Sequence, residues 1–288
     1  MKTVQSSLVS ALVGLVAPAS LLAQMAIAVP RNGVIDISVT RERVEVHGWD
    51  RNELVLEGNT AHEALRTASG AQVRRIRGRT SNEPLRINVP RSVSIVLDGS
   101  SNDVDVRNIE GDVEVRVNNG DVTMSHIGGR VRVASIFGDI NVADVRKGTR
   151  IVTAGGDVTM SDLQGSAEVT TTGGNISLTR STAGNVALET INGDVRFSGT
   201  LAEGSRNTIS THSGSVHLEF TSDARATIEM SSFMGELRSQ KSLVMMPDSD
   251  RSGRESAYRL QLGVGGPTVV VTTFSGNIDI TRIDAPSN

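Results

Sequence analysis

The chain has 288 residues, 38% of them apolar, and a formal net charge of −3. It contains no cysteine, one tryptophan, one tyrosine and five phenylalanines. A conventional globular core of this length uses more aromatic side chains, because these bury the most surface per residue. The nearly balanced charge argues against the basic footprint of a nucleic-acid-binding domain, and the lack of cysteine excludes disulfides and argues against lipid attachment.

Residues 1–28 have the organisation of an export signal. Lys2 precedes a short apolar run over 8–16, Pro18 ends that run, and small residues follow. This order is typical of a signal peptide, here with cleavage after residue 23 or 28. A membrane anchor is the alternative, but the run is short for a bilayer. We therefore expect an exported protein of the periplasm, cell envelope or extracellular space, with no membrane span once the signal is removed.

Residues 29–110 predict irregular coils and a cap at one end of the structure. Alternating apolar residues favour strands; these are expected at 34–39, 44–46, 54–56, 73–76, 85–89, 93–97 and 104–106. We expect Trp49 to cover the open end of the core, since terminal coils of a repeat protein need a cap. Thr60 and Glu63 fit a capping box, so 60–70 is either a short helical turn or a loop.

Residues 111–200 carry a nine-residue phrase that recurs and alternates, so that the true unit is about 18 residues. The first apolar position of every second phrase is occupied by Val122, Ile140, Val158 and Ile176. Each phrase provides one strand and one turn, and two phrases provide one coil. The pattern predicts a single-domain, all-β β-solenoid, of the β-helix or β-roll kind, with two strands per coil.

The turns of this array pair a glycine with an aspartate or asparagine. The positions are Gly120, Asp121, Gly138, Asp139, Gly156, Asp157, Gly174 and Asn175. Glycine tolerates positive φ, and the following side chain can bond to local backbone in the turn. Calcium-binding nonapeptide repeats have the same period, but their phrase supplies a second glycine and aspartate that this one lacks. We expect a structural role for these turns, with no metal and no cofactor.

Residues 18 apart should stack into lanes on the two outer faces. One face carries the charged lane Glu114, Arg132, Arg150 and Glu168, which we interpret as solvated. The other carries two uncharged lanes, and these comprise Thr123, Asn141, Thr159 and Ser177, and then Ser125, Ala143, Ser161 and Thr179. This hydroxyl strip is either an ordinary strand surface or a contact surface for an envelope glycan, another protein or a second copy of the rod.

Residues 201–288 continue the coils with a looser period. The stretches 232–237 and 273–278 are near copies of each other, and 241–267 is irregular and rich in turn-forming residues. We expect 241–267 to be an excursion from the rod, with 258–262 as its returning strand. The strands at 269–271 and 278–280 are then expected to close the last coils.

Several phrases together resemble the bacterial putative-adhesin family, a β-strand-repeat domain of exported and envelope proteins. They are Val46-His47-Gly48-Trp49-Asp50, Leu85-Arg86-Ile87-Asn88-Val89-Pro90, the nonapeptide array, Gly265-Gly266-Pro267 and Thr273-Phe274-Ser275-Gly276-Asn277-Ile278. The resemblance covers nearly all of the chain after the signal. It implies a β-solenoid in or outside the cell envelope, and it supplies no catalytic motif.

The sequence shows none of the usual motifs of catalysis or metal binding. Its five histidines have no HExxH spacing, and no nucleotide-binding or nucleophile fingerprint is present. Polysaccharide-cleaving parallel β-helices need two carboxylates within about 5–10 Å, whereas Glu114 and Glu168 are expected about 14 Å apart. We therefore predict a non-enzymatic structural or binding module of the bacterial envelope, adhesin-like in character. The alternatives are a carbohydrate-active enzyme on the same scaffold and a self-assembling scaffold.

Overall fold

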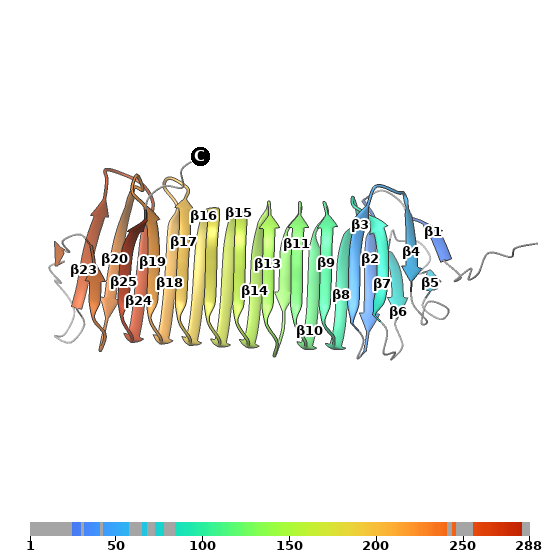
Figure 1. Cartoon of the computed structure of the whole chain (residues 1–288), viewed down its shortest axis with the longest axis horizontal. Coiled ribbons are helices and arrows are strands. Elements are labelled where there is room, and N and C mark those ends of the chain that lie inside the picture. Colours follow the sequence, from blue (N-terminus) through green and yellow to red (C-terminus); the bar gives the residue numbers. More distant parts are fainter. Residues whose placement is uncertain are drawn as a thin grey trace, which may run out of the picture.

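The computed structural model of the chain describes residues 25–29, 32–40, 43–57, 65–67, 73–77, 84–240, 244–245 and 256–283. Every regular element within these ranges is a β-strand, and the strands stack into one elongated rod (Figure 1). A membrane-crossing helix does not occur in the described ranges. The expected signal peptide lies outside them, apart from its last four residues.

Most coils contribute one strand to each of two faces, which enclose the core. We call the face that carries the predicted hydroxyl lanes the hydroxyl face, and the other the opposite face. In spatial order the hydroxyl face consists of β1 (Met25–Ala28), β4 (Glu53–Glu57), β7 (Leu85–Pro90), β3 (Val44–Trp49), β9 (Val104–Ile109), β11 (Val122–Ile127), β13 (Ile140–Val145), the first halves of β15 (Val158–Gly173) and β16 (Ile176–Asn192), β17 (Val195–Leu201), β19 (Val216–Thr221), β25 (Ile278–Ile283) and β21 (Leu237–Ser239).

The opposite face runs along the other side of the core. In spatial order it consists of β5 (Leu65–Thr67), β6 (Val73–Arg77), β2 (Val34–Val39), β8 (Ser94–Ser101), β10 (Val113–Asn119), β12 (Val131–Ala134), β14 (Gly148–Gly155), the second halves of β15 and β16, β18 (Arg206–Ser213), β24 (Thr268–Ser275), β20 (Ala226–Ser232), β23 (Ser256–Leu262) and β22 (Val244–Met245).

The apolar positions of the repeat form columns in the core. Val122 pairs with Ile140, Ile140 with Val158, and Val158 with Ile176, and each of these side chains is at most 1% exposed. The neighbouring strands are parallel, as a coil that always turns the same way requires. The predicted inner column is therefore confirmed, and the residues between its members point outward because side chains alternate along a strand.

The later coils hold two aromatic residues in the core. Phe197 and Phe220 are both buried, with ring centroids 5.9 Å apart. The core is therefore not purely aliphatic at this end of the array. The register lengthens at this point, since Ile176 pairs with Val195 and Val195 with Val216, and the longer coils provide the room that the rings need.

The turn aspartates connect successive coils. Oδ1 of Asp121 accepts a hydrogen bond of 2.9 Å from the backbone N–H of Asp139, and Oδ1 of Asp139 accepts one of 2.9 Å from Asp157. The same relation links Asp103 to Asp121, Asp157 to Asn175, Asn175 to Asp194, Asp194 to Ser215, Ser215 to Asn277 and Asn277 to Glu236. We expected bonds to the local backbone of the turn, but these bonds go to the next coil.

A second ladder lies inside the same turns. Buried hydroxyls donate hydrogen bonds to glycine carbonyls, from Thr153 to Gly155, Thr171 to Gly173, Thr190 to Gly174, Thr211 to Gly193, Thr273 to Gly214 and Ser232 to Gly276. These bonds satisfy carbonyl groups that the turn would otherwise leave unpaired in the interior. The threonines of the repeat therefore have an internal structural role as well as a surface one.

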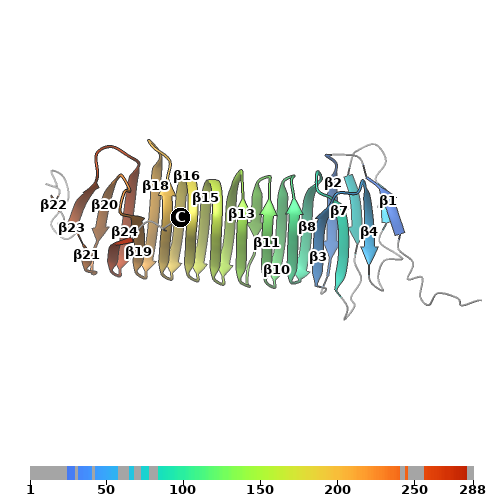
Figure 2. The same ribbon diagram turned by 45° about the horizontal axis from the view of Figure 1, so that its top comes forward.

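The coils at both ends are not stacked in sequence order. At the N-terminal end β2 lies between β6 and β8, and β3 lies between β7 and β9. At the C-terminal end β24 lies between β18 and β20 (Figure 2), and β25 lies between β19 and β21. The expectation that the strands at 269–271 and 278–280 close the last coils is wrong, because both are inside the stack.

Antiparallel strands occupy the outer positions of both faces at the N-terminal end and of the opposite face at the C-terminal end, whereas β21, the last strand of the hydroxyl face, is parallel to β25. β4 pairs antiparallel with β7 and with β1, β5 pairs antiparallel with β6, and β23 pairs antiparallel with β20 and β22. The predicted returning strand is present as β23, which extends the opposite face beyond β20, while 241–243 and 246–255 lie outside the described residues. Leu65–Thr67 form a strand, so a helical turn is wrong there, and the rest of 60–70 lies outside the described residues.

Trp49 does not cover the end of the core. It belongs to β3, which has β7 on one side and β9 on the other, and its indole N–H donates a 2.8 Å hydrogen bond to the Glu53 carbonyl. The guanidinium of Arg51 lies 4.9 Å from the ring centroid. Trp49 therefore stabilises the turn between β3 and β4, and the antiparallel strands provide the cap.

Candidate functional site

The predicted hydroxyl strip lies in the middle of the hydroxyl face, on four neighbouring strands. The first lane contains Thr123, Asn141, Thr159 and Ser177, and the second contains Ser125, Ala143, Ser161 and Thr179. All eight side chains are half-buried or exposed. Because rungs are about 4.8 Å apart, the strip is an uncharged, regularly spaced surface about 14 Å long.

A polar cluster adjoins the strip at its N-terminal side. β9, β3 and β7 continue the two lanes of the strip, with Asp105, Glu45 and Arg86 in the first lane and Arg107, His47 and Asn88 in the second. These side chains surround a hollow of about 400 Å³, which Glu57 on β4 and Arg43 also line. We call this group the N-terminal cluster.

Ion pairs organise the N-terminal cluster. Arg86 Nε lies 2.9 Å from Oε2 of Glu45, and the guanidinium of Arg107 pairs with Asp105. The hydrogen bond from Arg107 to Asp105 raises the pKa of the arginine. Asn88 donates a 3.2 Å bond to Glu57. Each of the three carboxylates therefore has a donor beside it.

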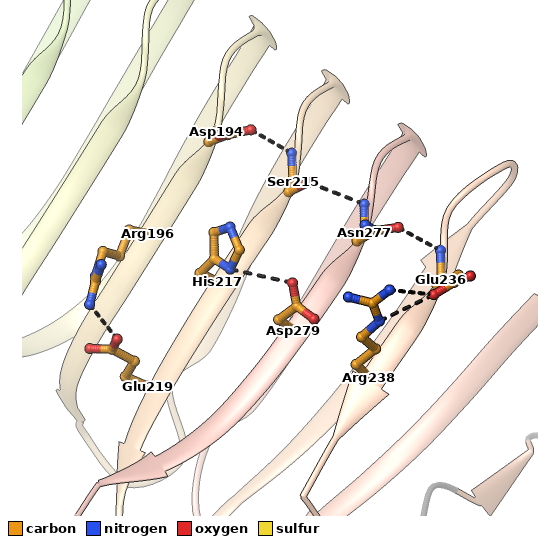
Figure 3. Close-up of polar contacts among 9 residues, drawn as sticks. All are labelled: Asp194, Arg196, Ser215, His217, Glu219, Glu236, Arg238, Asn277 and Asp279. Atoms are coloured by element: carbon orange, nitrogen blue, oxygen red, sulfur yellow. Dashed lines mark hydrogen bonds and ion pairs between the residues drawn. The ribbon is translucent and has the colours of Figure 1, made fainter.

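A second polar cluster adjoins the strip at its C-terminal side, on β17, β19, β25 and β21 (Figure 3). The first lane continues through Arg196, His217, Asp279 and Arg238. Within this C-terminal cluster, Arg196 pairs with Glu219 of the second lane, His217 Nδ1 lies 3.4 Å from Asp279, and Arg238 lies 2.6 Å from Glu236. The strip is thus bounded by mixed charge on both sides.

Sequence reasoning missed both clusters. They combine strands that are distant in the chain, such as β3 with β7 and β19 with β25, and those neighbours follow from the out-of-order stacking. A local signal was present: charged or polar residues alternate with buried apolar ones in β3, β7, β9 and β19. That signal marks outward positions but does not show which of them share a lane.

The predicted charged lane is on the opposite face. Arg150 Nη1 lies 2.8 Å from Oε2 of Glu168, as expected for neighbouring rungs. Glu114, however, pairs with Arg116 two residues further on, and not with Arg132. These pairs are more than 30% exposed, and exposed pairs contribute only about 0–1 kcal/mol each, which agrees with a solvated surface.

Exposed rings form a short stack where β18, β24 and β20 end. The rings of His212 and Phe274 lie 4.8 Å apart and those of Phe274 and Phe233 lie 4.9 Å apart, with interplanar angles of 6° and 8°. The inner faces of the three rings cover one another, although Phe233 and Phe274 are 40% and 41% exposed. The stack joins three strands that are consecutive in space but not in sequence.

Three carboxylates of the N-terminal cluster line the same hollow. Glu45 pairs with Arg86, Asp105 pairs with Arg107, and Glu57 accepts a hydrogen bond from Asn88. Within the described residues, histidine and carboxylate side chains form no group of three that could hold a metal ion.

Stacked parallel coils, hydrogen-bonded turn ladders and a flat uncharged strip define a repeat β-solenoid. The chain belongs to the Toastrack DUF4097 family, whose model matches residues 35–281. This supports the resemblance to adhesin-like β-strand-repeat domains. Comparison with curated proteins gives no match. One similar solved structure is that of a provisionally named cell adhesion protein from Clostridium sporogenes, with 10% sequence identity, a TM-score of 0.25, and coverage of 90% of this chain and 100% of that one.

Proposed function

We propose that this protein is a non-enzymatic, exported contact module of the bacterial envelope that binds through its hydroxyl face. The observation that carries the proposal is the uncharged strip, bounded on both sides by polar clusters. Such a surface offers hydroxyl and amide groups at a fixed spacing on a stiff scaffold. It can therefore meet another ordered surface with little loss of side-chain entropy, because serine and threonine have few rotamers to lose.

Export is the second part of the proposal. Its support is the signal-like organisation of residues 1–28, with its short apolar run and small residues near 23 and 28. The test is N-terminal sequencing of the mature protein after fractionation of the producing bacterium. We expect a new N-terminus at residue 24 or 29 in an envelope or extracellular fraction. An intact chain in the cytoplasm would contradict the proposal.

Site-specific photo-crosslinking in the producing bacterium tests the contact face without presupposing the partner. A photoreactive amino acid at Thr159 reports on the hydroxyl face, and one at Arg150 on β14 is the matched control on the opposite face. We expect high-mass crosslinks from position 159 and few from position 150. Equal crosslinking at both positions would exclude a preferred face.

The enzymatic alternative has a direct test. The purified protein is incubated with envelope polysaccharides, and the release of soluble reducing ends is measured. We expect no release above the background. If release occurred and the Glu45→Gln variant abolished it, the carbohydrate-active alternative would replace the contact function.

A further inference from the structure

The first lane of the hydroxyl face has a pattern of charge that is its own complement. From β4 to β21 the outward side chains are Glu57, Arg86, Glu45, Asp105, Thr123, Asn141, Thr159, Ser177, Arg196, His217, Asp279 and Arg238. The charges therefore run negative, positive, negative, negative, then four neutral residues, then positive, histidine, negative, positive. Reading the lane from the other end and exchanging positive for negative gives the same order of charges. In this comparison His217 counts as a basic residue.

A two-fold axis makes use of this property. If the axis lies parallel to the strands and passes between the rows of Asn141 and Thr159, it reverses the order of the rungs and keeps the first lane opposite the first lane. Asp105 then faces Arg196 of the second copy, and Arg86 faces Asp279 of the second copy. In the same way Glu45 faces His217, and Glu57 faces Arg238. Each pairing occurs twice, because a two-fold interface is isologous.

The second lane agrees with the same axis. Arg107 would face Ser198, His47 would face Glu219, and Asn88 would face Thr281 across the axis. No like charges oppose each other in this lane. In the centre Asn141 faces Thr159, Thr123 faces Ser177 and Ser125 faces Thr179, and hydroxyl and amide groups both donate and accept hydrogen bonds. Ser161 faces Ala143.

We infer that the hydroxyl face binds a second copy of this chain, and that the product is a two-fold symmetric face-to-face dimer. The inference rests on the proposed function as a contact module and names its partner. An envelope glycan is the less favoured occupant: a neutral glycan would add no opposite charge to the ion pairs that the two clusters form within the chain, and an anionic one would meet Glu45, Asp105 and Asp279. A second copy of the chain, turned by the two-fold axis, places an opposite charge against each charge of the first lane.

The size of the face is sufficient for a stable dimer. The strands from β4 to β21 extend over about 50 Å, and the outward part of each strand is about 15 Å wide. This corresponds to about 750 Å² per copy, or about 1,500 Å² in total, within the range of specific protein interfaces. The rod runs straight along this length (Figure 1), so that the two faces can meet over most of it.

Two charge-reversal variants test the inference. Arg86→Glu places a glutamate opposite Asp279 of the second copy, and Asp279→Arg places an arginine opposite Arg86. We expect each variant alone to dimerise about 10- to 100-fold more weakly than the wild type in analytical ultracentrifugation. When the two are mixed, every opposing pair is again of opposite sign, so the mixture should form dimers. Changes confined to one chain cannot explain a recovery that appears only on mixing.

Arg150→Glu on the opposite face is the matched control, because the side chains of Arg150 and Arg86 are both 58% exposed. It should dimerise like the wild type. A wild type that stays monomeric at about 100 μM, or a mixture that does not recover, would overturn the inference. If such a monomer still crosslinks to another envelope component from position 159, the contact function stands with a different partner. If position 159 gives no preferential crosslinks, both proposals fail.

Discussion

Oδ1 of Asp139 lies 2.9 Å from the backbone nitrogen of Asp157, so that a side chain in one turn holds the backbone of the next coil. The same relation recurs along the turns from Asp103 to Glu236. Its role is to pair a backbone donor that the parallel ladder leaves free at the corner. Because successive rungs between these turns repeat the bond, the ladder helps to fix their register.

The hydrogen bonds between turn aspartates of successive coils predict different results for two substitutions at Asp139. Asp139→Ala should destabilise the rod by about 1 kcal/mol, because the Asp157 N–H loses its partner. Asp139→Asn should be nearly neutral, since Asn175 already occupies the equivalent place and accepts the bond from Asp194. Urea unfolding measures the difference, and hydrogen exchange at the Asp157 amide should quicken in the alanine variant only. Equal stability of the two variants would disprove a role for the ladder.

Two adjacent glycines should respond differently to alanine. A Cβ on Gly174 would lie 2.1 Å from the Gly156 carbonyl oxygen, and its φ of +131° disfavours a side chain. A Cβ on Gly173 would meet nothing closer than 3.8 Å. We expect Gly174→Ala to cost more than about 2 kcal/mol and Gly173→Ala less than about 1 kcal/mol. Thermal unfolding by circular dichroism provides the comparison, and the reverse order would contradict the turn geometry.

A buried and an outward residue of the same strand provide a third test. Leu178 on β16 is fully buried, whereas its neighbour Ser177 is half-buried on the hydroxyl strip. Leu178→Ala should destabilise by about 2–5 kcal/mol through the cavity that it leaves. Ser177→Ala should change stability by less than about 0.5 kcal/mol. Chemical denaturation of both variants checks the assignment of inner and outer positions.

The pair of Asp162 and Arg180 predicts a pH dependence. The Arg180 guanidinium, 2.8 Å from Asp162, holds the pKa of that carboxyl below its usual range. A depressed pKa in the folded state contributes stability above the unfolded pKa of about 3.9, and this is lost as the pH falls through the folded value. Asp162→Asn should therefore lower the unfolding midpoint at pH 7, with a difference that shrinks below about pH 4.

The control for this pH effect is the partner residue. Arg180→Gln should show the same pH-dependent difference, and the double variant should lose no more than either single one, because both remove one interaction. Asn is also compatible with the φ of +56° at Asp162, so the substitution adds no backbone strain. If the two single effects simply added, the stability difference would have another origin.

The middle of the rod could be predicted from the sequence because its information is local. Each nonapeptide specifies its own strand and turn, and identical phrases can only stack in register, which places Val122 beside Ile140 and Thr123 beside Asn141. The two ends could not be predicted in this way. Whether β24 packs outside β20 or between β18 and β20 depends on contacts between distant segments, and no period in the sequence encodes that choice.

For the candidate site, too, only the part that lies in the regular middle of the rod could be predicted from the sequence. The hydroxyl lanes could be predicted, because they lie within the regular array. The clusters around Glu45 and Asp279 could not, because they depend on the inserted coils. The partners of the turn aspartates were also out of reach, since a spacing in sequence does not tell a local bond from one between coils.

The insertion of β24 and β25 has a consequence for how the chain acquires its shape during synthesis. Strand β20 is made well before β24, yet in the finished rod β24 separates it from β18. Strands β24 and β25 must therefore insert between strands that were translated earlier. Sequential addition of coils from one end cannot produce this order. Any polypeptide released before residue 268 lacks both inserted strands, so translation has to pass residue 283 before this end of the rod can reach its final order.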